Sequence, residues 1–331
     1  VPVMALLLIL GPRLLPEYRD PSAGRLDLAS AALALLAVLA VIFGLKEVAQ
    51  GGSLFLAVSA TIFGLVLAWL FVRRQRKLAD PLIDLSLFAT KAFQASLVTY
   101  LLAVFVVAGY FLFIAQFMQL VLALSPLEAG LWGLPAALSF VVGSQVGPRV
   151  LNRFRPALVM SLGLASAAFG LFILLFVGGR YDLALITVAS VIVSLGLAPV
   201  ITMATELIVS SAPQEKAGAA SGISETSGEL GGALGIALLG SLGTAVYRGL
   251  LAPRLDLSGA EREQALDTLG GALEVAARLP AEQADSLLTL ARDAFTDSMR
   301  LTSTTAAVVA VVIAVVAWRM LGSVRPIASQ N

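Results

Sequence analysis

The chain has 331 residues, 59% apolar and 13% charged, with a mean hydropathy of +0.93, values that exclude an ordinary soluble domain and indicate a membrane protein. Its net charge of +1 gives no indication of a nucleic-acid partner. The sequence contains no cysteine and no histidine, which excludes disulfides and thiolate or imidazole metal sites, so any proton chemistry depends on carboxylates.

The hydrophobic runs predict eight complete membrane-spanning helices and part of another. Residues 1–15 are shorter than the span of about 20 residues that a bilayer requires, and we interpret them as the remnant of a helix whose start is missing. Each run must be helical, because lipid offers no partners to backbone groups. The expected fold class is an all-α, multi-pass transmembrane helical bundle. The complete spans are predicted at 28–49, 53–72, 93–122, 129–148, 156–177, 183–209, 218–246 and 301–321.

The basic residues predict the orientation of these spans. If the first run leads inward, fourteen of the 22 basic residues fall on the inner side, whereas the short outer turns hold only Lys46 and Arg180. This arrangement predicts a cytoplasmic linker at 73–92 and a cytoplasmic tail at 323–331. The loop at 247–299 is then outside. The excess of arginine over lysine, eighteen to four, beside abundant alanine and glycine suggests a bacterial source, and hence a bacterial cytoplasmic membrane.

The long loop at 247–299 predicts a helical hairpin. Ser258 and Glu261 have the spacing of a capping box that opens a helix through about Arg278, and Pro280 lies near the start of a second helix. Two roles are open for this hairpin. It is a structural cap on the outer face, or it takes part in substrate entry or partner contact.

The stretch SETSGELGGALG, residues 224–235, places two acids inside an apolar span. Glu225 and Glu229 lie about 11 and 17 Å deep at 1.5 Å per residue, on one helix face and about 6 Å apart. A charge at that depth costs about 2.5 to 3.5 kcal/mol, so the pair is expected to be buried against protein or a water-filled cavity. Such acids can exchange a proton for a lipophilic cation. The alternative is that they stay neutral and only hydrogen-bond neighbouring hydroxyl groups.

A third acid and several aromatic and amide side chains are further candidates. Glu206 lies near the inner end of the preceding span and can couple to protons or simply reach the interface. Aromatic rings hold organic cations, and amides indicate a cavity, although ordinary helix packing explains any single ring equally well. The expected cavity residues are Tyr110, Phe113, Gln116, Phe117, Gln119, Ser139 and Gln145.

No phosphate-binding loop, zinc motif, nucleophile elbow or dinucleotide fingerprint occurs in the sequence. We therefore expect no enzyme, no cofactor and no metal site. The glycines around the two acids include several Gly-X-X-X-Gly spacings, which allow helices to approach closely.

Several segments resemble the fourteen-helix drug:proton antiporters of the major facilitator superfamily, of the quaternary-ammonium and methyl viologen efflux type. They are LLPEYRDPSAGRLDLAS, FGLKE, AGLWGLP and the stretch from residue 198 to residue 247. The resemblance implies that 1–15 is helix 6, that 28–72 is the extra central pair of helices, and that 93–322 is the C-terminal half of the transporter. It also implies that GPRVLNRFRP, with Arg149, Arg153 and Arg155, is a second copy of the family's cytoplasmic loop.

By this resemblance we expect proton-coupled efflux of hydrophobic, often cationic compounds. Its partners are such substrates, protons, the lipid bilayer and a missing N-terminal half of the same transporter, without which the fragment should be inactive. Two alternatives stay open. One is an exporter of a specific metabolite or lipid on the same scaffold, and the other is a non-transporting membrane sensor or scaffold.

Overall fold

The computed structural model describes residues 27–49, 52–78, 85–151 and 154–322, together with Met4, Pro81 and Ile83. Within these residues all regular elements are helical, and eight helices are long and apolar enough to cross a membrane. The predicted fold class and the eight complete spans are therefore confirmed. The predicted remnant at 1–15 lies, except for Met4, outside the described residues.

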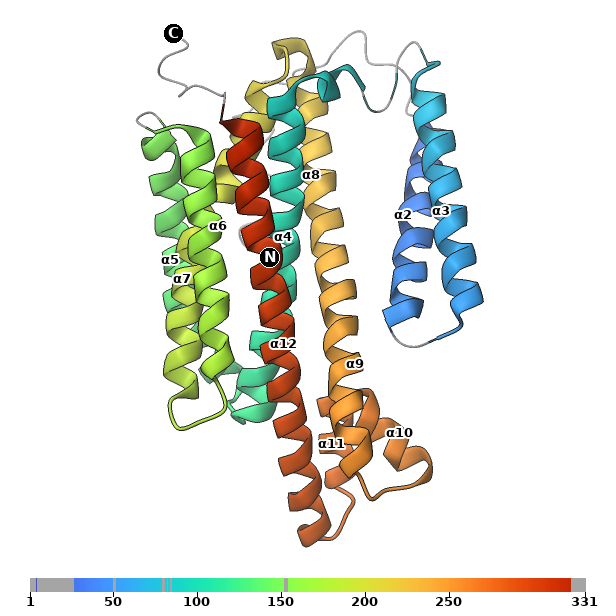
Figure 1. Ribbon diagram of the computed structural model, residues 1–331, viewed down its shortest axis with the longest axis vertical. Coiled ribbons are helices and arrows are strands. Elements are labelled where there is room, and N and C mark those ends of the chain that lie inside the picture. The colour runs from blue at the N-terminus through green and yellow to red at the C-terminus, as the bar shows by residue number, and fades with distance from the viewer. Residues whose placement is uncertain are drawn as a thin grey trace.

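The spans from residue 91 onward form one elongated bundle (Figure 1). Its members are α4 (Lys91–Gln116), α5 (Pro126–Leu151), α6 (Pro156–Ile173), α7 (Asp182–Ser210), α8 (Ala217–Leu234) with α9 (Gly240–Leu251), and α12 (Ala281–Leu321). α7 packs against α5 and α6, while α12 packs against α6, α4 and α9. α4 connects the two sides through its contacts with α7 and α8, so α8 lies at an edge of the bundle.

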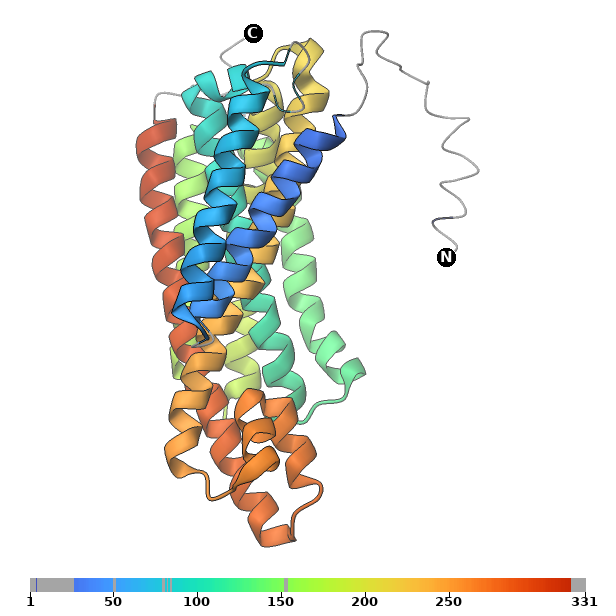
Figure 2. The ribbon, with the colours of Figure 1, turned by 90° about the vertical axis from the view of Figure 1, so that its right-hand side faces the viewer.

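Two further spans, α2 (Leu28–Ala49) and α3 (Leu54–Gln75), pack against each other along their length. They stand beside the α8 and α9 side of the bundle (Figures 1 and 2). Their surfaces carry large exposed apolar side chains such as Leu35, Phe55 and Ile62. This surface suits lipid, because apolar side chains need no other cover inside a bilayer.

A polar network joins the start of α2 to the end of α3. The Arg74 guanidinium donates two hydrogen bonds of 3.1 Å to the Asp27 carboxylate, and Gln75 Nε2 donates to Ser30 Oγ at 2.6 Å. The Ile83 N–H donates to Gln75 Oε1 at 3.1 Å, which ties the linker to the same point. The hydrogen bonds from Arg74 hold the pKa of Asp27 well below its usual range, so this carboxylate stays ionised at physiological pH.

The loop between the last two spans is helical, as predicted, but its helices begin and end at other residues than the two predicted ones. Its first part consists of α10 (Gly259–Asp267) and α11 (Leu269–Ala276), because Thr268 is extended and its Oγ1 accepts a 3.0 Å hydrogen bond from Gly271 N. Its second part is continuous with the last span, since α12 runs for 41 residues. The predicted hairpin helix and the predicted final span are thus one helix.

The predicted capping box at the start of α10 is wrong. Ser258 does precede the helix, yet its side chain makes no capping hydrogen bond. Arg262 organises this turn instead, since its guanidinium donates to the carbonyl oxygens of Ala252 at 2.8 Å and Leu255 at 2.6 Å. These bonds satisfy carbonyl groups that the end of the preceding helix leaves without partners.

Candidate functional site

α8 has two faces of different chemistry. One face packs against α4 and is rich in glycine, a residue that favours helix weakly in water but allows close helix contact in a membrane. The other face is exposed, and we call it the acidic face of α8. Its residues are Gly218, Ser221, Gly222, Glu225, Thr226 and Glu229.

The packed face brings an aromatic side chain next to the acids. A Cβ atom on Gly228 would lie 2.8 Å from the Tyr100 hydroxyl oxygen, so Tyr100 of α4 rests directly on the α8 backbone between the two acids. The Tyr100 side chain also lies near Thr205 of α7 and near both Glu225 and Glu229. Tyr100 therefore links three helices at this depth.

The structure places both acids as the sequence predicts along the helix, but it does not bury them. Glu225 and Glu229 lie about 12 and 18 Å from the start of α8, at 1.5 Å per residue. Both are exposed, because α4 and α7 cover only the opposite side of α8. The described residues leave both side chains uncovered, and the expectation that the pair is buried against protein or a water-filled cavity stays a prediction.

Neighbouring hydroxyl groups do not donate hydrogen bonds to the acids within the described residues. Thr226 Oγ1 donates to the Gly222 carbonyl oxygen at 2.8 Å, and the buried Ser224 hydroxyl has no partner there. Neither Glu225 nor Glu229 accepts a hydrogen bond or forms an ion pair among these residues. Among the residues that the structure describes, the acidic face thus presents two carboxylates with no hydrogen-bond or ion-pair partner.

Glu206, the third predicted acid, is exposed on α7 four residues before that helix ends at Ser210. The preceding residue, Thr205, lies near Tyr100, and its Oγ1 donates to the carbonyl oxygen of Ile201 at 3.0 Å. Tyr100 was not predicted as a site residue, because its contact with Gly228 joins two helices that are far apart in the chain.

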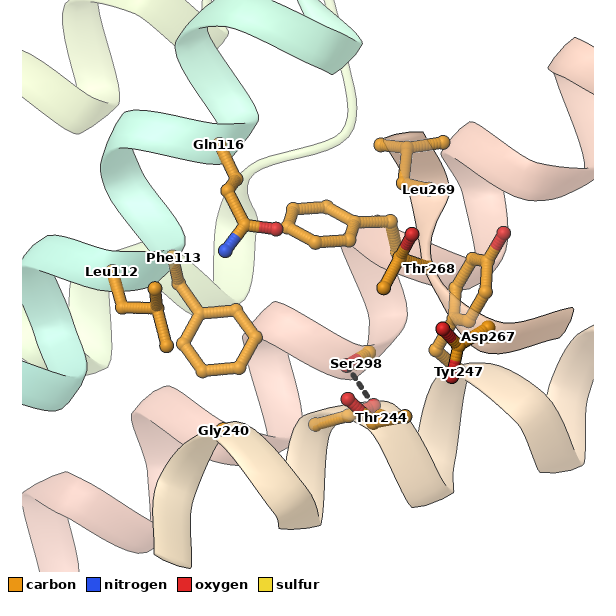
Figure 3. Close-up of a pocket in the computed structure, with 12 residues that line it drawn as sticks. Leu112, Phe113, Gln116, Gly240, Thr244, Tyr247, Asp267, Thr268, Leu269 and Ser298 are labelled. Carbon is orange, nitrogen blue, oxygen red and sulfur yellow. Dashed lines mark hydrogen bonds between the residues drawn. The ribbon is translucent and has the colours of Figure 1, made fainter. Parts of the chain in front are cut away.

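Two of the predicted cavity residues line a pocket at the loop end of the bundle (Figure 3). This pocket has a volume of about 140 Å³, and Phe113 and Gln116 of α4 form part of its wall. The Phe113 ring lies 6.0 Å from the ring of Phe295 on α12. The remaining wall includes residues that the sequence analysis missed: Thr244, Tyr247, Asp267 and Thr268.

The other predicted cavity residues do not join this pocket. Tyr110 and Phe117 are buried in the packed core, where the Tyr110 hydroxyl is hydrogen-bonded to Ser190 of α7. Gln119 is exposed near the end of α4. Ser139 and Gln145 lie on α5, and Ser139 Oγ donates to the carbonyl oxygen of Pro135 at 2.7 Å. For Tyr110 and Phe117, helix packing is thus the role that the structure supports.

A family model described as Major Facilitator Superfamily matches residues 5–236. The chain belongs to the Major Facilitator Superfamily. The matched range contains α2 through α8, including Glu206, Glu225 and Glu229.

Curated relatives support the branch of the superfamily that the sequence resembles. The chain is 38% identical to the multidrug efflux pump LfrA of Mycolicibacterium smegmatis, over 96% of this chain and 63% of that protein. It is 27% identical to the methyl viologen resistance protein SmvA of Salmonella typhimurium, over 96% of this chain and 64% of that protein. The chain therefore spans less than two thirds of the length of these relatives.

A solved transporter supports the fold. A bacterial homologue of the human lysosomal transporter Spinster matches with a TM-score of 0.58 and 19% identity. The match covers 82% of this chain and 59% of the other. At this identity the likeness shows the fold alone.

The predicted superfamily loop after α5 is described only in part. Arg149 lies within α5, but its side chain and the whole of Arg153 fall outside what the structure describes. Arg155 is exposed at the start of α6, and its carbonyl oxygen accepts a 3.0 Å hydrogen bond from Leu158 N.

Proposed function

We propose that the whole protein exports hydrophobic, often cationic compounds across the cytoplasmic membrane in exchange for protons. The relatives named multidrug efflux pump and methyl viologen resistance protein support this substrate class. A relative in Streptomyces glaucescens, at 29% identity, is named a tetracenomycin C resistance and export protein. Two of these three names state efflux or export, and two state resistance.

The acidic face of α8 is the observation that carries the proposal. Two carboxylates lie exposed about 12 and 18 Å along a helix of a membrane protein. Leaving one charge against lipid at the bilayer centre costs about 2.5 to 3.5 kcal/mol. The face therefore borders water or further protein in the membrane, rather than acyl chains.

A water-filled pathway along this face gives Glu225 and Glu229 a chemical role. An ionised carboxylate attracts a lipophilic cation, and protonation removes that attraction, so proton and substrate compete for one site. Aromatic rings such as Tyr100 add cation–π attraction of about 0.5 to 2 kcal/mol. Entry of protons down their gradient then releases the bound compound to the outside.

We also propose that further helices of the same transporter cover the acidic face and complete the pathway. Described helices α4 and α7 pack on the other side of α8, and they leave this side open. The curated relatives are longer than this chain, with 63% of LfrA covered. On this proposal the 331-residue chain alone does not transport, and its linker and tail lie in the cytoplasm.

The test is exchange by the whole protein in proteoliposomes. We expect an imposed proton gradient to drive uptake of ethidium, a cationic dye, and ethidium addition to move protons in the opposite direction. Proton movement without dye transport would instead favour an exporter of a specific metabolite or lipid. The absence of both fluxes would contradict the proposal and favour a sensor or scaffold.

A further inference from the structure

A groove at the end of α3 combines apolar walls with positive charge. It has a volume of about 400 Å³ and lies between α2 and the end of α3. Its walls are Leu33, Leu70 and Leu78 together with Arg73, Arg74 and Lys77. An apolar cleft with a basic rim is complementary to a phospholipid, because the acyl chain is apolar and the phosphate is negatively charged.

The basic residues of the rim are not equivalent. Arg74 is engaged by Asp27, with an Arg74 Nη2 to Asp27 Oδ2 distance of 3.0 Å, so its charge is already balanced. Arg73 and Lys77 are exposed, and the described part of the chain gives neither of them a carboxylate partner. Two positive charges are therefore free to bind an anion at this rim.

An aromatic ring places the rim at the membrane surface. The Arg73 guanidinium carbon lies 5.2 Å from the centre of the exposed Trp69 ring. Tryptophan favours the interface between acyl chains and headgroups, and arginine at the end of a span extends toward the headgroups. The groove thus opens at the depth where lipid phosphates lie.

The position of the α2 and α3 pair exposes this groove to lipid. The pair stands beside the bundle, and α3 ends at the same end of the molecule where α4 begins (Figures 1 and 2). The exposed apolar side chains of α3, among them Phe63 and Val66, continue from the groove toward the middle of the span. A lipid whose phosphate reached Arg73 would lay its acyl chain along this surface.

We propose that the groove between α2 and α3 binds an anionic phospholipid, with its phosphate held by Arg73 and Lys77 and its acyl chain against Leu33, Leu70 and Leu78. The interaction does not depend on what the protein transports. Each basic residue near an anionic membrane surface contributes about 1 kcal/mol, so loss of two weakens binding about 30-fold.

Native mass spectrometry of the purified whole protein tests the proposal with phosphatidylglycerol and phosphatidylethanolamine of matched acyl chains. We expect phosphatidylglycerol to bind more tightly to the wild type, and the double variant Arg73→Gln, Lys77→Gln to lose about 30-fold in affinity. The matched control is Arg76→Gln, Arg319→Gln. It removes two exposed charges that do not line the groove, and it should bind like the wild type.

A second variant separates the groove from surface charge. Leu70→Trp fills the apolar part and leaves every charge in place, and we expect it to weaken phosphatidylglycerol binding as well. The proposal is overturned if the control variant loses as much affinity as the groove variant, or if phosphatidylethanolamine binds as tightly as phosphatidylglycerol. Displacement of the lipid by an equal concentration of inorganic phosphate would also overturn it, because the acyl chain would then contribute nothing.

Discussion

Replacing both Glu225 and Glu229 by glutamine should abolish proton-driven export of cationic dyes by the whole protein. Glutamine keeps the shape of glutamate but can neither attract a cation nor exchange a proton. A carboxylate 4 Å from a cation contributes up to about 4 kcal/mol at an effective dielectric constant of about 20. Loss of even 1.4 kcal/mol lowers affinity tenfold. We therefore expect dye affinity to fall by at least about tenfold, together with loss of the pH dependence.

The controls separate charge from folding. Glu225→Asp, Glu229→Asp retains both acids and should keep part of the pH-dependent efflux. Glu261→Gln, Glu282→Gln removes two exposed acids from the helical loop and should leave efflux unchanged. The measurement is efflux of ethidium from energised cells at several external pH values. Wild-type efflux from the Glu225→Gln, Glu229→Gln variant would contradict a coupling role for these acids.

The second large effect concerns the contact between α4 and α8. A Cβ atom on Gly231 would lie 2.3 Å from the Leu101 carbonyl oxygen, and one on Gly235 would lie 2.3 Å from that of Phe105. A backbone carbonyl cannot rotate away from a new methyl group, whereas the end of a flexible side chain can. Gly231→Ala should therefore force α4 and α8 apart. Overpacking of this kind costs about 1 to 3 kcal/mol. We expect a lower thermal unfolding temperature in detergent, and a larger loss in the Gly231→Ala, Gly235→Ala double variant.

An adjacent glycine provides the matched control. A Cβ atom on Gly232 would meet nothing closer than Val104 Cγ1 at 3.8 Å, so Gly232→Ala should change stability by less than about 0.5 kcal/mol. Equal unfolding temperatures for Gly231→Ala and Gly232→Ala would show that the close approach of α4 and α8 does not limit stability. Tyr100 of α4 lies against Gly228, one turn before Gly231 on the same face of α8. Gly231→Ala should therefore also displace the Tyr100 side chain from Gly228.

The spans could be predicted from the sequence because each depends on local composition. An apolar run of about 20 residues must form a helix in lipid whatever its neighbours are, and the helices found at 28–49 and 54–75 follow the predicted runs closely. The loop was harder to predict, since the break at Thr268 and the continuous α12 depend on tertiary contacts. Thr268 Oγ1 caps a helix that Ser258 had been expected to start.

The candidate site could be predicted only in part. The sequence places Glu225 and Glu229 on one helix face, and in the structure both lie exposed on one side of α8. Which side of α8 packs against α4 depends on the contacts of Gly228 and Gly231, and these involve residues more than 100 positions away. The same limit explains why Tyr110 was expected in a cavity and is found in the core.

The central claim is that the acidic face of α8 borders water within the membrane. The sequence contains no cysteine, so Glu225→Cys and Glu229→Cys each introduce the only thiol of this chain. Thiols react with maleimides as thiolates, and these form in water and not among acyl chains. Val308→Cys on the exposed apolar surface of α12 is the control for a position facing lipid.

The deciding measurement is the rate at which a water-soluble maleimide labels these variants of the whole protein in open membrane fragments. We predict rapid labelling at positions 225 and 229, slowed by ethidium, and little labelling at position 308. Labelling at positions 225 and 229 as slow as at position 308 would contradict the account, because the acidic face would then lie against lipid or in a dry interior.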